Sequence, residues 1–216
     1  MLLETIMSRN LFMVQAATPV TDAQELMRRE HIHHLPVLDQ HNKKLVGIVS
    51  EKDLLYASPS PASTLDVYEM ARLLSKLTVT KVMTKKVLTA TPKDLVEDAA
   101  RTMVDNDISC LPVVDADGYP VGIVTESDIF KLFIDLFGTR EKGLRATLRI
   151  PEEAGELAKL GQDVTSHGGN IVSIGTWPGD KPTNAVCIMK VTGMDKDRFI
   201  ASVSAHILEV IDIRET

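Results

Sequence analysis

Val46-Gly47-Ile48-Val49-Ser50-Glu51-Lys52-Asp53 returns later in the chain as Val121-Gly122-Ile123-Val124-Thr125-Glu126-Ser127-Asp128. A second pair of matching runs lies upstream, where Leu35-Pro36-Val37 corresponds to Leu111-Pro112-Val113. Self-similarity at a nearly fixed spacing is the sequence sign of a repeated structural unit. Two copies of one unit therefore occupy about the first two thirds of the chain.

Each copy is predicted to fold in the order β-α-β-β-α. In the first copy, apolar runs from Leu11 to Val14, Leu35 to Leu38 and Leu45 to Val49 predict three strands. Thr21 and Gln24 have the spacing of a capping box, which predicts that a helix begins there. A second helix follows the third strand and ends the unit.

The domain organisation follows from these copies and from what surrounds them. We predict an α/β (α+β) chain with one repeat at residues 1–56 and the second at 79–137. Residues 57–78 contain a Ser/Pro-rich break and then an amphipathic pattern, which predicts a linker helix. Residues 144–216 alternate as β-α-β-β-α-β, the order of a ferredoxin-like sandwich.

Composition excludes several classes of function. The chain has 24 Lys and Arg against 30 Asp and Glu, so it lacks the basic surface that nucleic-acid binding requires. No apolar run is long enough to cross a bilayer and no secretory signal is visible, so we expect a cytoplasmic protein without a membrane partner. Cys110 and Cys187 form no C-x-x-C or Cys/His cluster, so we expect reduced thiols and no metal site.

The repeated run ends in a hydroxyl residue followed three positions later by a carboxylate, as Ser50 with Asp53 and as Thr125 with Asp128. A hydroxyl and helix-terminal amides suit a phosphate, and an ionised Asp accepts hydrogen bonds from a vicinal diol. A ribose phosphate satisfies both. The alternative is that the hydroxyls are N-caps and the carboxylates complement the helix dipole.

A second set of polar or small residues precedes each Leu-Pro-Val run, as Ile32-His33-His34 and as Ile108-Ser109-Cys110. At the entrance to a buried strand, backbone groups are able to read an adenine edge. His33 and His34 would point to opposite faces of a strand, which disfavours a zinc site and leaves one imidazole near a phosphate. Cys110 has no assigned base, and the chain shows no triad or P-loop, so we expect no enzyme activity.

Residues 1–137 resemble a CBS-domain pair, or Bateman module, in three repeated marks: Ile/Val-Met-Ser/Thr, Leu-Pro-Val-x-Asp and Gly-Ile-Val-Ser/Thr-x-x-Asp. The resemblance implies a pseudo-twofold module with up to two clefts for AMP, ADP, ATP, NAD or S-adenosylmethionine, each built by both repeats. By position, one cleft would use Asn10, Phe12, Ile32, His33, His34, Thr125 and Asp128. The other would use Lys86, Leu88, Ile108, Ser109, Cys110, Ser50 and Asp53. Lys85 and Lys86 favour a di- or triphosphate in the second cleft, and the alternative is that both lie in a solvated loop.

Residues 144–216 resemble an ACT domain. Ile150-Pro151-Glu152-Glu153-Ala154-Gly155-Glu156-Leu157 occupies the place of that family's acidic-x-Pro-Gly-x-Leu turn, with Gly155 in place and Ala154 where Pro is usual. ACT domains commonly pair side by side and bind amino acids at the interface, which implies a homodimer. The helical stripe Phe130, Phe133 and Phe137 is interpreted as core or as a dimer contact.

The order of CBS pair, linker and ACT-like domain resembles the acetoin-utilisation AcuB-type proteins. We expect a regulator in which an adenine nucleotide binds the CBS clefts and the ACT-like domain or an unidentified protein target responds. The alternative is an amino-acid sensor at an ACT-like dimer interface, with the CBS pair as scaffold.

Overall fold

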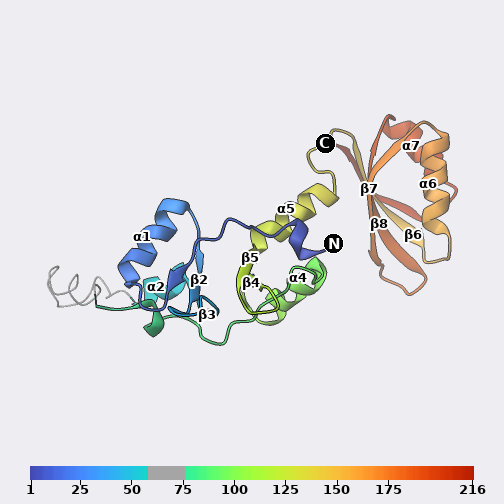
Figure 1. Ribbon diagram of the computed structural model, residues 1–216. Helices are drawn as coiled ribbons and strands as arrows, with labels where there is room; N and C mark the ends of the chain where they lie inside the picture. The colour runs from blue at the N-terminus through green and yellow to red at the C-terminus, as the bar shows by residue number, and fades with distance from the viewer. Residues whose placement is uncertain (58–75) are drawn as a thin grey trace. The chain divides into compact units, whose positions relative to one another are not determined.

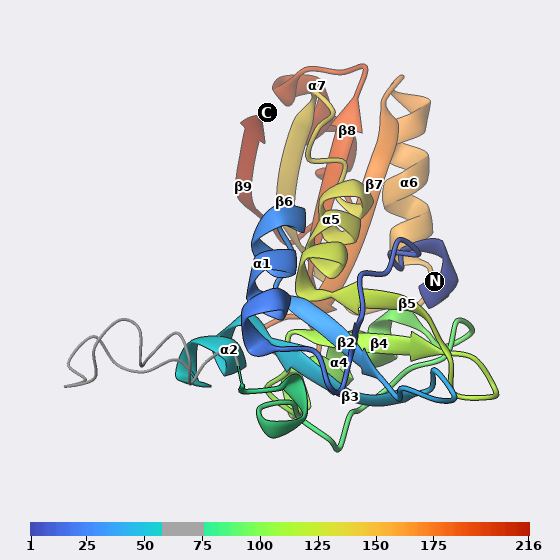
Figure 2. The same ribbon diagram turned by 60° about the vertical axis from the view of Figure 1, so that its left-hand side comes forward.

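The computed structural model describes residues 1–57 and 76–216 (Figures 1 and 2). The predicted linker helix lies almost entirely outside these residues. The chain divides into two compact units, Met1–Ile129 and Phe130–Thr216, and each is described by itself.

The first repeat has the predicted β-α-β-β-α order. Its elements are the 3-10 helix η1 (Leu3–Thr5), β1 (Val14–Gln15), α1 (Val20–Glu30), β2 (His34–Leu38), β3 (Leu45–Ser50) and α2 (Glu51–Ala57). The central strand β2 pairs in parallel with β1 and antiparallel with β3. The first strand was predicted from Leu11 to Val14, but only Val14 of that run lies in β1. The observed strand is therefore shorter and begins further along the chain.

The predicted capping box at the start of α1 is wrong. The helix begins at Val20 after Pro19, and no side chain caps it. Thr21 is therefore already inside the first turn, and its hydroxyl donates to the Asp22 carboxylate at 3.2 Å. The fixed φ of proline starts this helix in place of a side-chain cap.

The second repeat follows the same plan. Its elements are η2 (Val79–Lys81), α4 (Val96–Asp105), β4 (Cys110–Val114), β5 (Pro120–Thr125) and α5 (Glu126–Leu136). The boundary between the two compact units falls within α5, so residues from Phe130 onward belong to the second unit. In place of a leading strand, Ala90 forms a single parallel bridge with Val113. The core positions Val96, Ala99 and Met103 of α4 are buried, as their equivalents are in α1.

The two repeats exchange their leading segments. The backbone N–H of Leu3, in η1, donates to the carbonyl of Asp94 in the second repeat at 2.9 Å. In the same way, the N–H of Val79, in η2, donates to the carbonyl of Thr18 in the first repeat at 2.9 Å. Each segment that precedes a repeat in the sequence is thus bonded to the other repeat.

The second unit is a four-stranded antiparallel sheet with two helices on one face (Figure 1). Its elements are β6 (Leu144–Pro151), α6 (Glu156–Ser166), β7 (Asn170–Pro178), β8 (Asn184–Thr192), α7 (Lys196–Val203) and β9 (Glu209–Glu215). The strand order is β7-β8-β6-β9, which confirms the predicted ferredoxin-like arrangement (Figure 2). Leu148, Leu160 and Phe199 are fully buried between sheet and helices.

Gly155 stands directly before α6 with a φ of 89°, a conformation that side chains with a Cβ rarely adopt. This explains why the glycine of the predicted ACT-type turn is in place. Within the described ranges, no helix is long and apolar enough to cross a membrane.

Candidate functional site

The Ser50–Asp53 pair forms a compact motif where β3 meets α2. The backbone N–H and the hydroxyl of Ser50 both donate to Oδ2 of Asp53, at 2.8 and 2.7 Å, and the Asp53 N–H donates back to the Ser50 hydroxyl at 3.2 Å. These bonds are the capping bonds of the alternative interpretation. They also fix the carboxylate in one orientation, and Oδ1 accepts no hydrogen bond from the described residues.

Thr125 and Asp128 repeat the motif at the junction of β5 and α5. The N–H and the hydroxyl of Thr125 donate to Oδ2 of Asp128 at 3.0 and 2.8 Å. The local geometry of the two motifs is therefore nearly the same. They differ in that Ser50 and Asp53 line the cavity described next, whereas Thr125 and Asp128 do not.

A cavity of about 790 Å³ opens beside the first motif. All seven residues predicted for the second cleft line it: Ser50, Asp53, Lys86, Leu88, Ile108, Ser109 and Cys110. The first two come from the first repeat and the other five from the second. The structure thus brings together the whole set that the resemblance implied for this cleft.

Backbone bonds between the repeats build this cavity. Ile48 of β3 and Thr84 exchange two backbone hydrogen bonds at 3.0 and 2.9 Å, which places Lys86 and Leu88 beside the end of β3. The Glu126 N–H donates to the carbonyl of Ser109 at 3.1 Å and fixes the chain before β4.

His34, which was predicted for the other cleft, lines this same cavity. Its Nε2 is 3.0 Å from the hydroxyl oxygen of Ser109. Burial, followed by the neighbouring His33, holds the pKa of His34 below its ordinary value of 6.5, and Asp53 opposes the shift. Burial and the neighbouring His33 both favour the neutral imidazole.

The other residues predicted for the first cleft are not brought together in this cavity or in a second, smaller cavity of the first unit. Ile32 and His33 line a cavity of about 590 Å³ between α1 and α2, where His33 Nδ1 is 2.7 Å from Glu51 Oε2. The residues that line neither cavity are Asn10, Phe12, Thr125 and Asp128. His33 lies in the bend before β2 and His34 is the first residue of that strand, and the two side chains line different cavities.

Charged groups of both signs line the larger cavity. Lys52 and Lys86 supply positive charge, and Asp53, Asp107 and Glu126 supply negative charge. Leu88, Ile108 and other apolar side chains form the rest of the wall. Such a cavity suits a ligand that combines hydroxyl donors, an anionic group and an apolar ring system.

Cys110 is not a nucleophile in this cavity. Burial, assisted by the negative charge of Glu126, raises the pKa of its thiol to about 12. The thiolate is the reactive form, and at neutral pH almost none is present.

Sequence reasoning missed Lys52, Asp107 and Glu126 as wall residues. Lys52 and Glu126 lie inside the two repeated runs, next to the hydroxyl and carboxylate residues, and this position in the sequence could have indicated that they line the cavity. Asp107, with a φ of 52°, follows α4 in a turn that no short pattern indicates.

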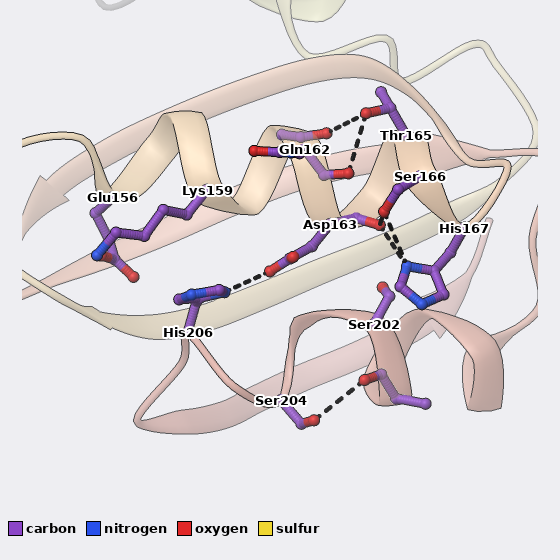
Figure 3. Close-up of polar contacts among 12 residues, drawn as sticks. Glu156, Lys159, Gln162, Asp163, Thr165, Ser166, His167, Ser202, Ser204 and His206 are labelled. Atoms are coloured by element: carbon purple, nitrogen blue, oxygen red, sulfur yellow. Dashed lines mark hydrogen bonds and ion pairs between the residues drawn. The ribbon is translucent and has the colours of Figure 1, made fainter.

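The second unit contains a polar cluster whose residue types resemble a catalytic set (Figure 3). His206 Nδ1 lies 2.6 Å from an Asp163 carboxylate oxygen. The Ser166 hydroxyl donates to the main-chain carbonyl of Asp163 at 3.1 Å, and His167 Nδ1 lies 2.7 Å from the same carbonyl. Ser166 Oγ also lies 3.3 Å from His167 Nδ1, but Nδ1 donates its hydrogen to the Asp163 carbonyl and so is unable to accept one from Ser166. The cluster therefore closes the end of α6 and activates no hydroxyl.

Metal-ligating residues do not converge in the part of the chain that the structure describes. No group of three or more His, Cys, Asp or Glu side chains is placed there to hold a metal ion.

Comparison with protein-family models matches the CBS domain at residues 3–60 and 79–135, and the TTHA0829-like ACT domain at residues 142–214. The uncharacterized protein MJ1426 of Methanocaldococcus jannaschii is 33% identical over 62% of this chain and 92% of its own length. CBSX2 of Arabidopsis thaliana, a chloroplastic CBS domain-containing protein, is 34% identical to this chain. The match covers 59% of this chain and 60% of CBSX2.

Solved structures agree with these matches over the first unit. The CBS domain pair of protein MJ0100, in complex with 5'-methylthioadenosine and S-adenosyl-L-methionine, has a TM-score of 0.52 and 30% identity, covering 65% of this chain and 98% of that one. CBSX2 in complex with AMP has a TM-score of 0.50 and 36% identity, with coverage of 62% and 96%.

A third solved structure, a putative acetoin utilization protein (AcuB) from Vibrio cholerae, has a TM-score of 0.53 and 32% identity, and the match covers 65% of this chain and 95% of that one. The duplicated motif, the exchanged segments and these matches lead to one assignment. The chain belongs to the CBS domain family, as a CBS domain pair followed by a TTHA0829-like ACT domain.

Proposed function

We propose that this protein is a regulator that binds an adenosine-containing nucleotide in the cavity beside Ser50 and Asp53. One observation carries the proposal: the cavity joins the Ser50–Asp53 motif of the first repeat to Lys86 and residues 108–110 of the second. The solved complexes of similar CBS pairs with AMP and with S-adenosylmethionine support adenosine as the shared chemistry.

The proposed pose follows from the groups on the wall. The unbonded Oδ1 of Asp53 accepts hydrogen bonds from the two ribose hydroxyls, because an ionised carboxylate only accepts. Lys86 and Lys52 attract the phosphates, and this favours ADP and ATP over AMP. The adenine ring packs on apolar side chains such as Leu88 and Ile108.

The proposed output is a change in the packing of the repeats rather than a chemical reaction. A ligand shifts such an equilibrium only as far as its affinities for the two arrangements differ. In our proposal, the ACT-like domain or a separate protein reads the shift. Hydrogen exchange of residues 144–216 with and without nucleotide tests the first route, and an unchanged exchange pattern there would leave only the second.

The binding proposal is tested by calorimetric titration of the full chain with AMP, ADP, ATP, NAD and S-adenosylmethionine. The key variant is Asp53→Ala and the matched control is Asp128→Ala, since each removes the carboxylate from the same capping motif. We expect at least one adenosine compound to bind, and Asp53→Ala to weaken it by roughly tenfold or more because charged hydrogen bonds are lost.

The control separates binding from folding. Both variants lose the two bonds from the preceding hydroxyl residue, so both are expected to melt at a lower temperature, while only Asp53→Ala loses affinity. Equal affinity in Asp53→Ala and the parent chain, or a loss confined to Asp128→Ala, would contradict binding at this cavity.

A further inference from the structure

The sheet of the second unit carries an unusual row of like charges on the face opposite α6 and α7. Lys190 of β8 lies directly across from Arg145 of β6, which in turn lies directly across from Arg214 of β9. The neighbours Leu144 and Ala146 point into the helix-covered core, so the row faces away from it. Like charges directly opposite one another on adjacent strands destabilise a sheet.

One carboxylate, that of Asp212, pairs with two of the three cations in this row. Asp212 is shared, because Oδ2 is 3.2 Å from Arg145 Nη1 and Oδ1 is 2.6 Å from Arg214 Nη2. Lys190 is only 4% exposed, and its ammonium group donates to the Thr216 hydroxyl. Within residues 1–57 and 76–216 it forms no ion pair. A buried cation with only a hydroxyl partner is costly, and an anion would remove that cost.

A cavity of about 620 Å³ lies at this row, entirely within the unit Phe130–Thr216. Its walls are mainly apolar and are formed by Phe133, Phe137, Trp177, Ile188 and Met189. Its polar residues are the cations Arg145 and Lys190 and the hydroxyl residues Thr139, Ser173 and Thr216. No Asp or Glu side chain lines it.

Aromatic side chains form one wall of this cavity. The rings of Phe133 and Phe137 are in contact, with centroids 4.6 Å apart and planes tilted by 39°. Ser173 donates its hydroxyl hydrogen to the Phe137 carbonyl at 3.2 Å, which holds the end of α5 on the sheet. Trp177 of β7 is 46% exposed, so a ligand in the cavity would cover it.

We propose that this cavity binds a small carboxylate with an aromatic or branched apolar body. The carboxylate lies between Lys190 and Arg145, where it relieves the repulsion across the strands, and the body packs against Phe133, Phe137 and Trp177. An amino acid fits less well, because its ammonium group would lie near two cations without a carboxylate partner in the wall. The ligand is therefore an acid without an α-amino group.

Trp177 is the single tryptophan of the chain, so its fluorescence reports directly on this cavity. The test is a fluorescence titration of the full chain with 3-phenylpropanoate, L-phenylalanine, phenethylamine and inorganic phosphate. We expect saturable binding of 3-phenylpropanoate, at least tenfold weaker binding of phenylalanine, and none of phenethylamine. Equal binding of the amine or of phenylalanine would overturn the proposal, as would a saturable change of the same size with phosphate alone.

Two variants locate the anion. Lys190→Met keeps most of the apolar stem and removes the charge, and we expect it to weaken 3-phenylpropanoate at least tenfold. Lys181→Met, in the exposed β7–β8 loop, is the control and is expected to bind like the parent chain. If Lys190→Met does not melt cooperatively, Arg145→Gln replaces it, with the same loss expected. Unchanged affinity in a folded variant of either kind would overturn the proposal.

Discussion

The hydroxyl oxygen of Ser109 lies 3.0 Å from Nε2 of His34, so a polar contact spans the cavity between the two repeats. His34 begins β2 of the first repeat and Ser109 immediately precedes β4 of the second. The contact couples the protonation of one side chain to the association of both repeats.

The stability of the CBS pair is expected to decrease as the solution becomes acidic. Because burial holds the pKa of His34 below 6.5, the folded chain binds a proton there less readily than the unfolded chain. The stabilisation is complete above pH 6.5 and is lost as the pH falls through the lower, folded-state pKa. Urea unfolding at several pH values in this range gives the free energy of unfolding as a function of pH. This dependence should be weaker for His34→Gln than for the control His41→Gln, whose imidazole lies in an exposed turn. The same pH dependence of the unfolding free energy in both variants would rule out His34 as the cause of the acid destabilisation.

Lys86 is expected to set the preference for polyphosphates. If Lys86 faces the phosphates of a bound nucleotide, Lys86→Ala should lower the affinity for ATP by roughly tenfold and that for AMP by much less. The neighbouring Lys85 does not line the cavity, so Lys85→Ala is the matched control. Calorimetry that finds the same ATP affinity in Lys86→Ala and Lys85→Ala would remove Lys86 from the phosphate site.

Both cysteines are expected to resist alkylation in the folded protein. Burial raises the pKa of Cys110 to about 12 and that of Cys187 to about 11, so at pH 8 the reactive thiolate is scarce in each. Mass spectrometry after iodoacetamide treatment should find neither residue modified in the native chain and both modified in urea. Rapid native labelling of Cys110 alone would show that its side of the cavity opens.

Two glycines of the second unit are expected to respond oppositely to alanine. A Cβ at Gly143 would lie 2.5 Å from the backbone oxygen of Val191, so Gly143→Ala should destabilise the unit by about 1–3 kcal/mol. Gly161 lies within α6 with nothing near its would-be Cβ, so Gly161→Ala should stabilise by up to about 1 kcal/mol. Denaturant unfolding measures both changes, and the same sign for both would contradict the packing described.

Much of the fold was predictable because it repeats or alternates. The duplicated run from Val46 to Asp53 indicated two equivalent units, and the apolar periodicity after Leu144 indicated the ferredoxin-like order. The start of α1 was mispredicted because a proline, rather than the side chain of Thr21, begins that helix.

The charge row of the second unit was not predictable from the sequence. Arg145, Lys190 and Arg214 become neighbours only through strand register, and the register shifts at irregularities such as that between Thr147 and Leu148. A shift of one residue would place a different side chain beside each partner. The pairing of distant strands leaves no local pattern that fixes this alignment.

The exchange of leading segments makes each repeat depend on the other for its completion. Leu3 bonds to the second repeat and Val79 to the first, so separation of the repeats breaks backbone bonds in both. Any molecule that fills the cavity between Asp53 and Ser109 adds its own binding free energy to that cohesion. A bound ligand is therefore expected to make the two repeats harder to separate than these backbone bonds alone do.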